Sequence, residues 1–234
     1  MKINEYLETL RSGANSIFEE TLEDARLGKC HHYIACIHEF SQLIKDESER
    51  KIISNVCNQL ESAILCATFG MYRQALSSLR LAFEMGLGCI YFSIYKMELN
   101  EWLNGKCDIK WSAIADEDNG ILSKRFAKAF APELTESISE IRENTKRNYR
   151  LLSEFVHGNS ETWSIHGAQL KYNNILLDQF IKAHGDVFEN IISLMCCRYY
   201  HGFSQHERDS LDFIREELGY NIGISKLLDK KNEQ

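Results

Sequence analysis

The stretch ELTESISEIRENTKRNYRLLSEFVH, residues 133–157, predicts one long helix and, through it, the class of the fold. Its apolar and small side chains recur at steps of three and four residues, the spacing of one buried stripe on an α-helix. The stripe comprises Ile138, Ile141, Thr145, Tyr149, Leu152 and Val156. Pro132 fits the first turn of a helix, and Gly158 fits the position after a helix end. We therefore expect a helix from Glu133 to His157.

Patterns of the same kind on both sides of this stretch predict further helices. They cover roughly residues 3–27, 31–45, 49–69, 71–96, 121–130, 175–200 and 206–218. Gly28 ends the first of them, and Gly70 separates the third from the fourth. Residues 98–120 predict an irregular loop. We expect one compact domain with N-terminal helices in residues 1–48, a helical core in 49–202, and a C-terminal helix and tail in 203–234.

Composition supports the same fold class. The chain has 234 residues, of which 44% are hydrophobic, with 13 glycines and a single proline. A disordered or collagen-like chain has a different composition, and an all-β protein needs more turn residues than this. Several long helices with short connections are most simply arranged as an all-α multi-helix bundle, with an up-and-down core and additional helices at both ends.

The charge is unevenly distributed. Lys and Arg total 27 against 34 Asp and Glu, a net charge of −7, which excludes binding to nucleic acid by bulk electrostatics. Residues 121–150 nevertheless carry seven basic side chains and only four glutamates. This part of the sequence predicts a local basic patch on an acidic body.

Eight cysteines lie mostly inside apolar helical runs, where a free thiol acts as a small hydrophobic side chain. The N-terminal MKINEYLETL lacks the apolar core of a signal peptide, and charged or polar residues interrupt the longest apolar stretches. We expect a cytoplasmic protein with reduced thiols and no membrane association.

Arg150 and His157 form the strongest candidate site. Seven residues on an α-helix return to nearly the same direction, so both side chains share a polar face, about 10 Å apart along the axis. A guanidinium binds phosphate and an imidazole transfers protons near neutral pH, so together they can cleave RNA without a metal. A simpler interpretation remains open, since a histidine complements the dipole at a helix end and a surface arginine needs no function.

An all-helical bundle with this Arg-x6-His element resembles the HEPN superfamily (higher eukaryotes and prokaryotes nucleotide-binding). The segments YRLLSEFVHG (149–158) and YRQALSSLRLAFE (72–84) are similar to bacterial and abortive-infection HEPN-like proteins, and the resemblance covers roughly residues 50–200. It implies a homodimeric, metal-independent endoribonuclease of toxin or antiphage defence, with Arg150 and His157 as the catalytic pair and an antitoxin or defence-system protein as partner. The family usually has a polar residue after the arginine, whereas Leu151 follows here.

Some members of the family bind without cleaving. The alternative function is therefore a non-catalytic HEPN-like module that binds a partner protein or a nucleotide. Leu151 and the net charge favour this alternative, and the local basic cluster favours the nuclease.

Five further side chains are candidates for supporting roles. Arg80 and Glu84 stand at i and i+4 in a largely apolar stretch, so they form either a simple surface ion pair or a partly buried pair that orients His157 or Arg150. Glu154 lies close to the proposed catalytic pair, and Lys146 and Arg147 are candidates for RNA contact.

We expect no cofactor and no metal. Glycine-rich phosphate loops and a serine nucleophile motif are absent from the sequence. Two i, i+4 pairs, His32 with Cys36 and Cys197 with His201, allow a Cys2His2 zinc site in principle, but buried thiols are the simpler interpretation. Trp102 and Trp111 are either a base-stacking surface or, with larger weight, an aromatic cluster beneath a loop.

Overall fold

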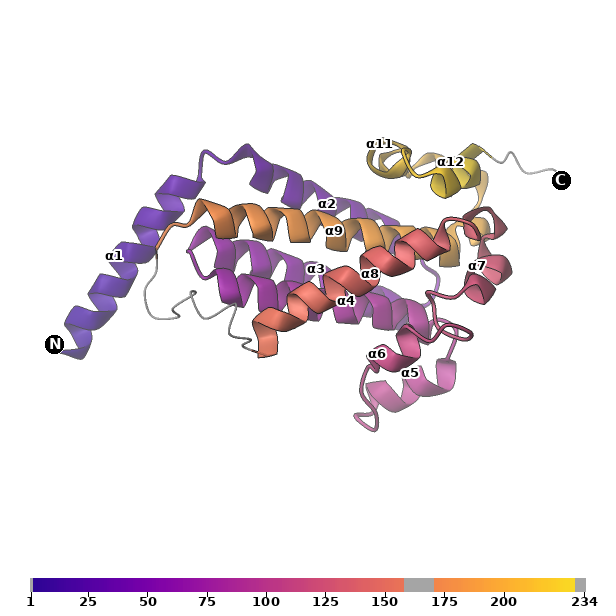
Figure 1. The fold of residues 1–234 in the computed structure, drawn as a ribbon, viewed down its shortest axis with the longest axis horizontal. Helices are drawn as coiled ribbons and strands as arrows, with labels where there is room; N and C mark the ends of the chain where they lie inside the picture. Colours follow the sequence, from indigo (N-terminus) through magenta and orange to yellow (C-terminus); the bar gives the residue numbers. More distant parts are fainter. Residues whose placement is uncertain (1, 158–170, 230–234) are drawn as a thin grey trace.

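The structure, a computed structural model, describes residues 2–157 and 171–229, and within them it has α-helices and no strand (Figure 1). The predicted all-α multi-helix bundle is confirmed. The long helices are α1 (Ile3–Thr21), α2 (Ala25–Gln42), α3 (Glu47–Thr68), α4 (Tyr72–Phe92), α8 (Ile138–His157) and α9 (Asn174–Tyr199). The short ones are α5 (Lys96–Leu103), α6 (Trp111–Ile114), α7 (Lys124–Phe130), α10 (Gln205–Asp209), α11 (Phe213–Leu218) and α12 (Ile222–Asp229), with 3₁₀ turns η1 (Pro132–Leu134) and η3 (Tyr200–Gly202).

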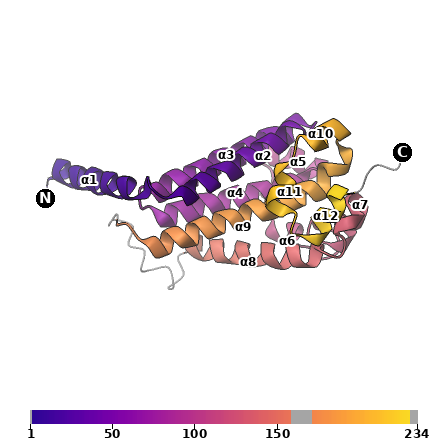
Figure 2. The same ribbon diagram turned by 90° about the horizontal axis from the view of Figure 1, so that it is seen from above.

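Helix α4 is the centre of the bundle. It packs against α3, α8 and α9, and α2 covers α3 and α9 from the other side (Figures 1 and 2). Leu76, Leu79, Phe83 and Leu87 of α4 are fully buried, and each such side chain contributes about 1.5–3 kcal/mol by leaving water. Buried side chains of α2, α4 and α11 belong to one continuous core. Residues from the three segments 1–48, 49–202 and 203–234 therefore share this core.

The first predicted helix is wrong at its C-terminal end. Helix α1 ends at Thr21, and Gly28 lies inside α2 rather than between two helices. The cause is Asp24, whose carboxylate accepts a hydrogen bond from the Arg26 backbone N–H at 3.0 Å and so caps the start of α2. Helix α1 projects from one end of the bundle (Figures 1 and 2), and it is anchored near its C-terminus, where Phe18 stacks on Phe69.

The predicted break at Gly70 is confirmed. Gly70 has φ of +71°, a left-handed conformation that glycine adopts without strain. The backbone N–H of Met71 donates to the Cys66 carbonyl at 2.8 Å, which closes the end of α3 and reverses the chain into α4.

The helix predicted from Glu133 begins later, at Ile138. Pro132 stands in the first position of η1, a single 3₁₀ turn, and the chain bends again over residues 135–137 before α8 starts. This bend buries Leu134 completely and packs η1 against α7 and α12. Tertiary packing therefore overrides the continuous helical pattern. The predicted end at Gly158 lies outside the described residues.

The buried stripe of α8 is confirmed at four positions, all of them buried: Ile138, Ile141, Thr145 and Leu152. Its end is wrong, because Val156 is 48% exposed and Phe155, at 4%, is the residue that enters the core. Asn148 is likewise buried, while Tyr149 is only half-buried and turns toward α4.

Three other predicted segments differ from the structure. Residues 98–120 contain most of α5 and all of α6, and the helix predicted over 206–218 is divided into α10 and α11. Helix α12 lies in what was expected to be tail. Trp102 is half-buried with its ring 5.5 Å from that of Phe92, so this segment folds onto the core through its aromatic side chains.

The eight cysteines are free thiols, six of them buried. Burial raises the pKa of the Cys36 thiol to about 11 and that of Cys30 to about 12. Among the described helices, α4 has the length and apolar composition of a membrane span, and 72% of its apolar window is buried inside the bundle.

Candidate functional site

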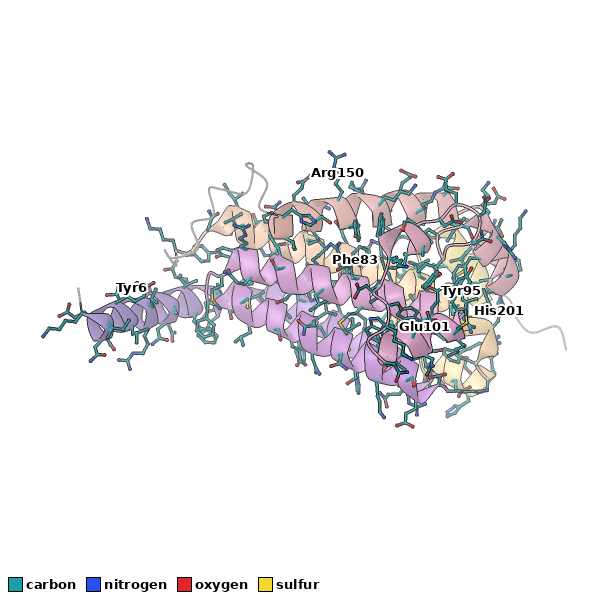
Figure 3. All side chains as sticks on the ribbon, turned by 90° about the horizontal axis from the view of Figure 1, so that it is seen from below. Tyr6, Phe83, Tyr95, Glu101, Arg150 and His201 are labelled. Carbon is teal, nitrogen blue, oxygen red and sulfur yellow. The ribbon has the colours of Figure 1, made fainter. Side chains whose placement is uncertain are left out.

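Arg150 and His157 lie on the outward edge of α8. The Arg150 side chain is 87% exposed and projects away from the bundle (Figure 3), with its Nε 3.7 Å from Oε1 of Glu154. His157 is the last residue of α8 and is exposed, without a hydrogen bond or ion pair to any residue that the structure describes. Both groups are therefore accessible to a ligand that approaches the outer side of α8.

The inner side of the same turn is held by Arg80. This side chain is only 8% exposed, and its Nε donates a hydrogen bond to Ser153 Oγ at 3.1 Å. Its Nη1 lies 2.5 Å from Oε1 of Glu84, as an ion pair without the direction of a good hydrogen bond. The guanidinium carbon stands 3.8 Å above the ring of Tyr149, a close cation–π contact. We call Arg80, Glu84, Tyr149 and Ser153 the Arg80 cluster.

Tyr149 links this cluster to the start of α6. One face of its ring stacks on Trp111 at a centroid distance of 3.6 Å, and its hydroxyl donates to Glu84 at 3.4 Å. Burial raises the pKa of the Tyr149 hydroxyl, so it stays protonated and acts as a donor. One face of the half-buried Trp111 ring is thereby covered by Tyr149.

Arg73 adds a second guanidinium from α4. Its Nε donates to the backbone carbonyl of Phe155 at 3.1 Å, within the last turn of α8 that ends in His157. The contacts of Arg73 and Arg80 show that α4 and α8 run antiparallel, and they fix the position of that last turn. Arg73, Tyr149 and Ser153 were not predicted as site residues, although the i, i+7 spacing of Arg73 and Arg80 repeats that of Arg150 and His157.

The structure brings Arg80 and Glu84 together, as their spacing predicts, and shows a partly buried pair rather than a surface pair. Glu84 contacts Arg80 and Tyr149, and no contact joins it to Arg150 or His157 among the described residues. The Arg80 cluster therefore holds α8 against α4.

Lys146 and Arg147 do not form one basic surface. Lys146 Nζ lies 3.6 Å from Oε1 of Glu117, whereas Arg147 Nη2 donates to Asn144 Oδ1 at 2.8 Å and lines a small cavity together with Glu189. The two side chains lie on different sides of α8, each beside acidic or amide oxygens. The basic cluster of residues 121–150 is thus divided between several surfaces.

The two pairs of the candidate zinc site have other partners. His32 Nε2 lies 3.4 Å from Cys36 Sγ, but it also faces Glu217, and His201 Nε2 lies 3.0 Å from Oε2 of Glu133. Within residues 2–157 and 171–229, no group of three or more His, Cys, Asp or Glu side chains is arranged to hold a metal ion.

Comparisons of the chain with protein-family models, with curated proteins and with solved structures find no match.

Proposed function

We propose that the protein is a HEPN-like, metal-independent endoribonuclease that acts as a homodimer. The observation that supports this proposal is the arrangement of α8: Arg150 and His157 are both accessible on its outer edge, while Arg80 and Arg73 hold its inner side against α4. The setting that the family resemblance implies, toxin or antiphage defence with an antitoxin or other protein partner, belongs to the same proposal.

The chemistry needs two proton transfers. A base removes the proton of the ribose 2′-hydroxyl, whose oxygen attacks the phosphorus, and an acid protonates the departing 5′-oxygen. The products are a 2′,3′-cyclic phosphate and a free 5′-hydroxyl. In each site His157 serves as the base or as the acid, and a water molecule takes or supplies the other proton; Arg150 stabilises the negative charge that develops on the phosphoryl oxygens.

A substrate on a single exposed helix edge is contacted from one side only. A second copy of the chain would contact it from the other side, and the proposal therefore includes a homodimer. If two α8 helices pair antiparallel about an axis midway between positions 150 and 157, Arg150 of one copy faces His157 of the other. A symmetric pairing then forms two equivalent sites, each with a guanidinium from one chain and an imidazole from its mate.

The direct test is cleavage of total RNA or tRNA by purified protein in the presence of EDTA. We expect Arg150→Met and His157→Gln each to lower the rate by about 100-fold or more. Arg11→Met and His206→Gln are matched controls, because they make the same changes at exposed positions far from α8 and should cut like the wild type. RNA left intact by the wild type, or equal cutting by all variants, contradicts the proposal.

A mixing experiment tests the dimer. When the Arg150→Met and His157→Gln proteins are combined and allowed to exchange subunits, mixed dimers contain one intact composite site, so about a quarter of wild-type activity should return. Sedimentation analysis measures the dimer independently. No recovery in a sample shown to contain mixed dimers would mean that each site uses two groups of the same chain.

The second candidate function is a non-catalytic HEPN-like module that binds a partner protein or a nucleotide. The division of Lys146 and Arg147 between two sides of α8 favours it, because RNA then meets no continuous basic surface. RNA left intact in the EDTA assay, together with measured binding of a nucleotide or a partner protein, supports this candidate over the nuclease.

A further inference from the structure

One cavity in the described part of the chain lies at the end of the bundle away from His157. It has a volume of about 570 Å³, opens to solvent, and is lined by the turn between α2 and α3, the start of α5, the end of α7 and the C-terminal end of α9. Figure 1 shows that α8 runs from this end toward α1, so His157 stands at the opposite end of that helix. A helix of this length spans about 30 Å, which separates the two places.

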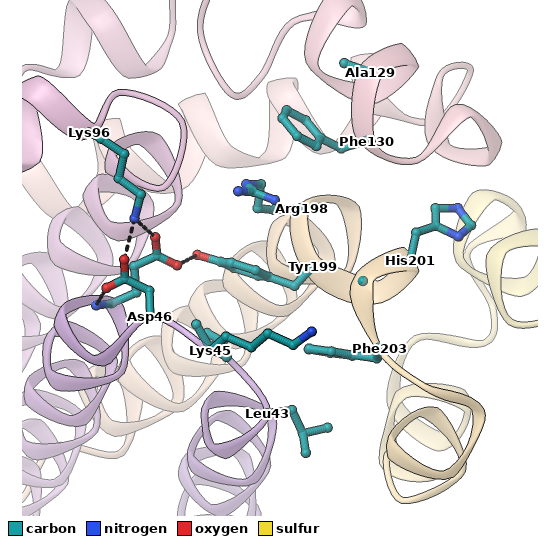
Figure 4. A pocket seen from close by; sticks show the side chains of 13 residues that line it. Leu43, Lys45, Asp46, Lys96, Ala129, Phe130, Arg198, Tyr199, His201 and Phe203 are labelled. Atoms are coloured by element: carbon teal, nitrogen blue, oxygen red, sulfur yellow. Dashed lines mark hydrogen bonds and ion pairs between the residues drawn. The ribbon is translucent and has the colours of Figure 1, made fainter.

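The acidic groups of the cavity are already neutralised. Glu49 is 3% exposed, accepts a hydrogen bond from the Tyr199 hydroxyl at 3.0 Å, and forms an ion pair with Lys96 (Figure 4). Lys96 also binds Asp46 at 2.7 Å, and the hydrogen bond from Lys96 is the largest effect that lowers the pKa of that carboxyl. Asp46 is further occupied as the cap of α3, where it accepts the Ser48 N–H at 2.9 Å.

Arg198 is held in place by hydrogen bonds, but some of its N–H groups have no partner among the described residues. Its Nε donates to Ser93 Oγ at 2.8 Å and its Nη2 to the Ser93 carbonyl at 3.3 Å, so one edge of the guanidinium is fixed. Its carbon lies 4.6 Å from the ring centre of Phe130 and 5.1 Å from that of Tyr199. Nη1 has no hydrogen bond to a described residue and is not among the buried unpartnered atoms. The edge of Nη1 and the second N–H of Nη2 is therefore open.

A second cation, Lys45, lines the same cavity. It is exposed, and its Nζ has no hydrogen bond or ion pair to a described residue. Among the residues that line the cavity, the three cations of Lys45, Lys96 and Arg198 outnumber the two carboxylates of Asp46 and Glu49. Leu43, Phe130 and Phe203 supply apolar wall on the same cavity (Figure 4).

We propose that this cavity binds a small organic anion whose carboxylate or phosphate is held by Arg198 and Lys45, with an apolar body against Phe130 and Phe203. A guanidinium edge with two parallel N–H groups matches either head group bidentately. The volume falls within the range of about 300–1,000 Å³ that is typical of small-molecule sites. This proposal does not depend on the endoribonuclease, since it uses none of the residues on the outer edge of α8.

The test uses the full chain and four probes of simple chemistry, benzoate, phenyl phosphate, inorganic phosphate and phenol, followed by ligand-observed NMR and thermal unfolding. We expect benzoate or phenyl phosphate to bind and to raise the Tm as concentration rises, with phenol and inorganic phosphate at least about tenfold weaker. Preference for one of the two aromatic anions identifies the head group.

Two variants locate the site. Lys45→Met changes an exposed side chain and should weaken the better probe about tenfold without lowering the Tm of the free protein. Arg198→Met should abolish binding, although it also removes the bonds to Ser93. Lys182→Met, an exposed lysine elsewhere on α9, is the matched control and should bind like the wild type. Binding that is equal in all three variants, or equal for phenol and the better of the two aromatic anions, or absent for both aromatic anions up to about 10 mM, overturns the proposal.

Discussion

Arg80 donates a hydrogen bond to Ser153 across 73 positions of sequence, and this bond fixes α8 one turn before His157. The same guanidinium faces Tyr149 and pairs with Glu84, so a single buried cation connects two helices and an aromatic stack. The outer edge of α8, with Arg150, is exposed to solvent because its inner side is held in this way.

Removal of this cation should destabilise the protein measurably. We expect Arg80→Met to lower the free energy of unfolding by about 2 kcal/mol, because the apolar stem is replaced but Ser153 and Glu84 lose a charged partner in a mostly buried place. Urea unfolding followed by circular dichroism measures the change. Arg11→Met, which removes an exposed i, i+3 ion pair with Glu8, is the matched control with an effect within about 0.5 kcal/mol. Equal effects of the two substitutions would mean that Arg80 is not a structural cation.

Phe155 and Val156 test the register of α8. We expect Phe155→Ala to cost about 3–5 kcal/mol, since Phe155 is in the core, and Val156→Ala to change stability by no more than about 0.5 kcal/mol. Both substitutions keep the helix and differ by one position, so chemical unfolding of the two proteins compares them directly. If Val156→Ala lost more stability than Phe155→Ala, Val156 would be the buried residue, as the apolar pattern predicts and contrary to the structure of this turn.

His184 should make stability dependent on pH. It is 0% exposed, packs near the rings of Tyr33 and Phe180, and neither ring nitrogen has a hydrogen-bond partner among the described residues. Burial lowers its pKa from 6.5 to about 4. Between these values the unfolded chain binds more protons, so stability from this group is complete above about pH 6.5 and is lost as pH falls toward 4.

Over the interval from pH 6.5 to 5.0 the loss from His184 should be about 1.5 kcal/mol. His184→Leu removes the titrating ring, so the difference in unfolding free energy between this variant and the wild type should grow by that amount across the interval. His206→Gln, an exposed histidine, controls for the loss of a histidine as such and should follow the wild type. Parallel curves for wild type and His184→Leu would contradict a buried neutral imidazole.

Helical periodicity was enough to predict the long helices, and the spacing of Arg80 and Glu84 was enough to predict their pairing. The partners of that pair on α8 were not predictable, because no local pattern indicates which helix packs on α4. The error at Val156 has a local cause. An apolar pattern selects Tyr149 over Asn148, but Asn148 is buried and Tyr149 is half-buried, just as Phe155 is buried and Val156 is exposed. At both places the buried face lies one residue before the predicted one.

For the candidate site residues, too, helix geometry predicts what lies on one helix, whereas contacts between helices could not be predicted. The shared face of Arg150 and His157 follows from helix geometry alone, and the structure agrees that both are exposed. The cavity around Arg198 could not be predicted, because Lys45, Phe130 and Arg198 are far apart in sequence and meet only after α3, α7 and α9 have packed. At Pro132 a local signal was present but gave the wrong result. Proline suits the start of a long helix, yet here it begins a 3₁₀ turn that buries Leu134.

The thiols have a practical consequence for following the protein as it opens. The six buried cysteines lie on four different long helices: Cys30 and Cys36 on α2, Cys57 on α3, Cys89 on α4, and Cys196 and Cys197 on α9. Alkylating reagents attack the thiolate, which burial suppresses, so each of these sulfurs becomes reactive only when its helix and the helices packed over it separate. Timed alkylation and peptide mass spectrometry of the unaltered chain therefore report which helix contacts of the bundle open first.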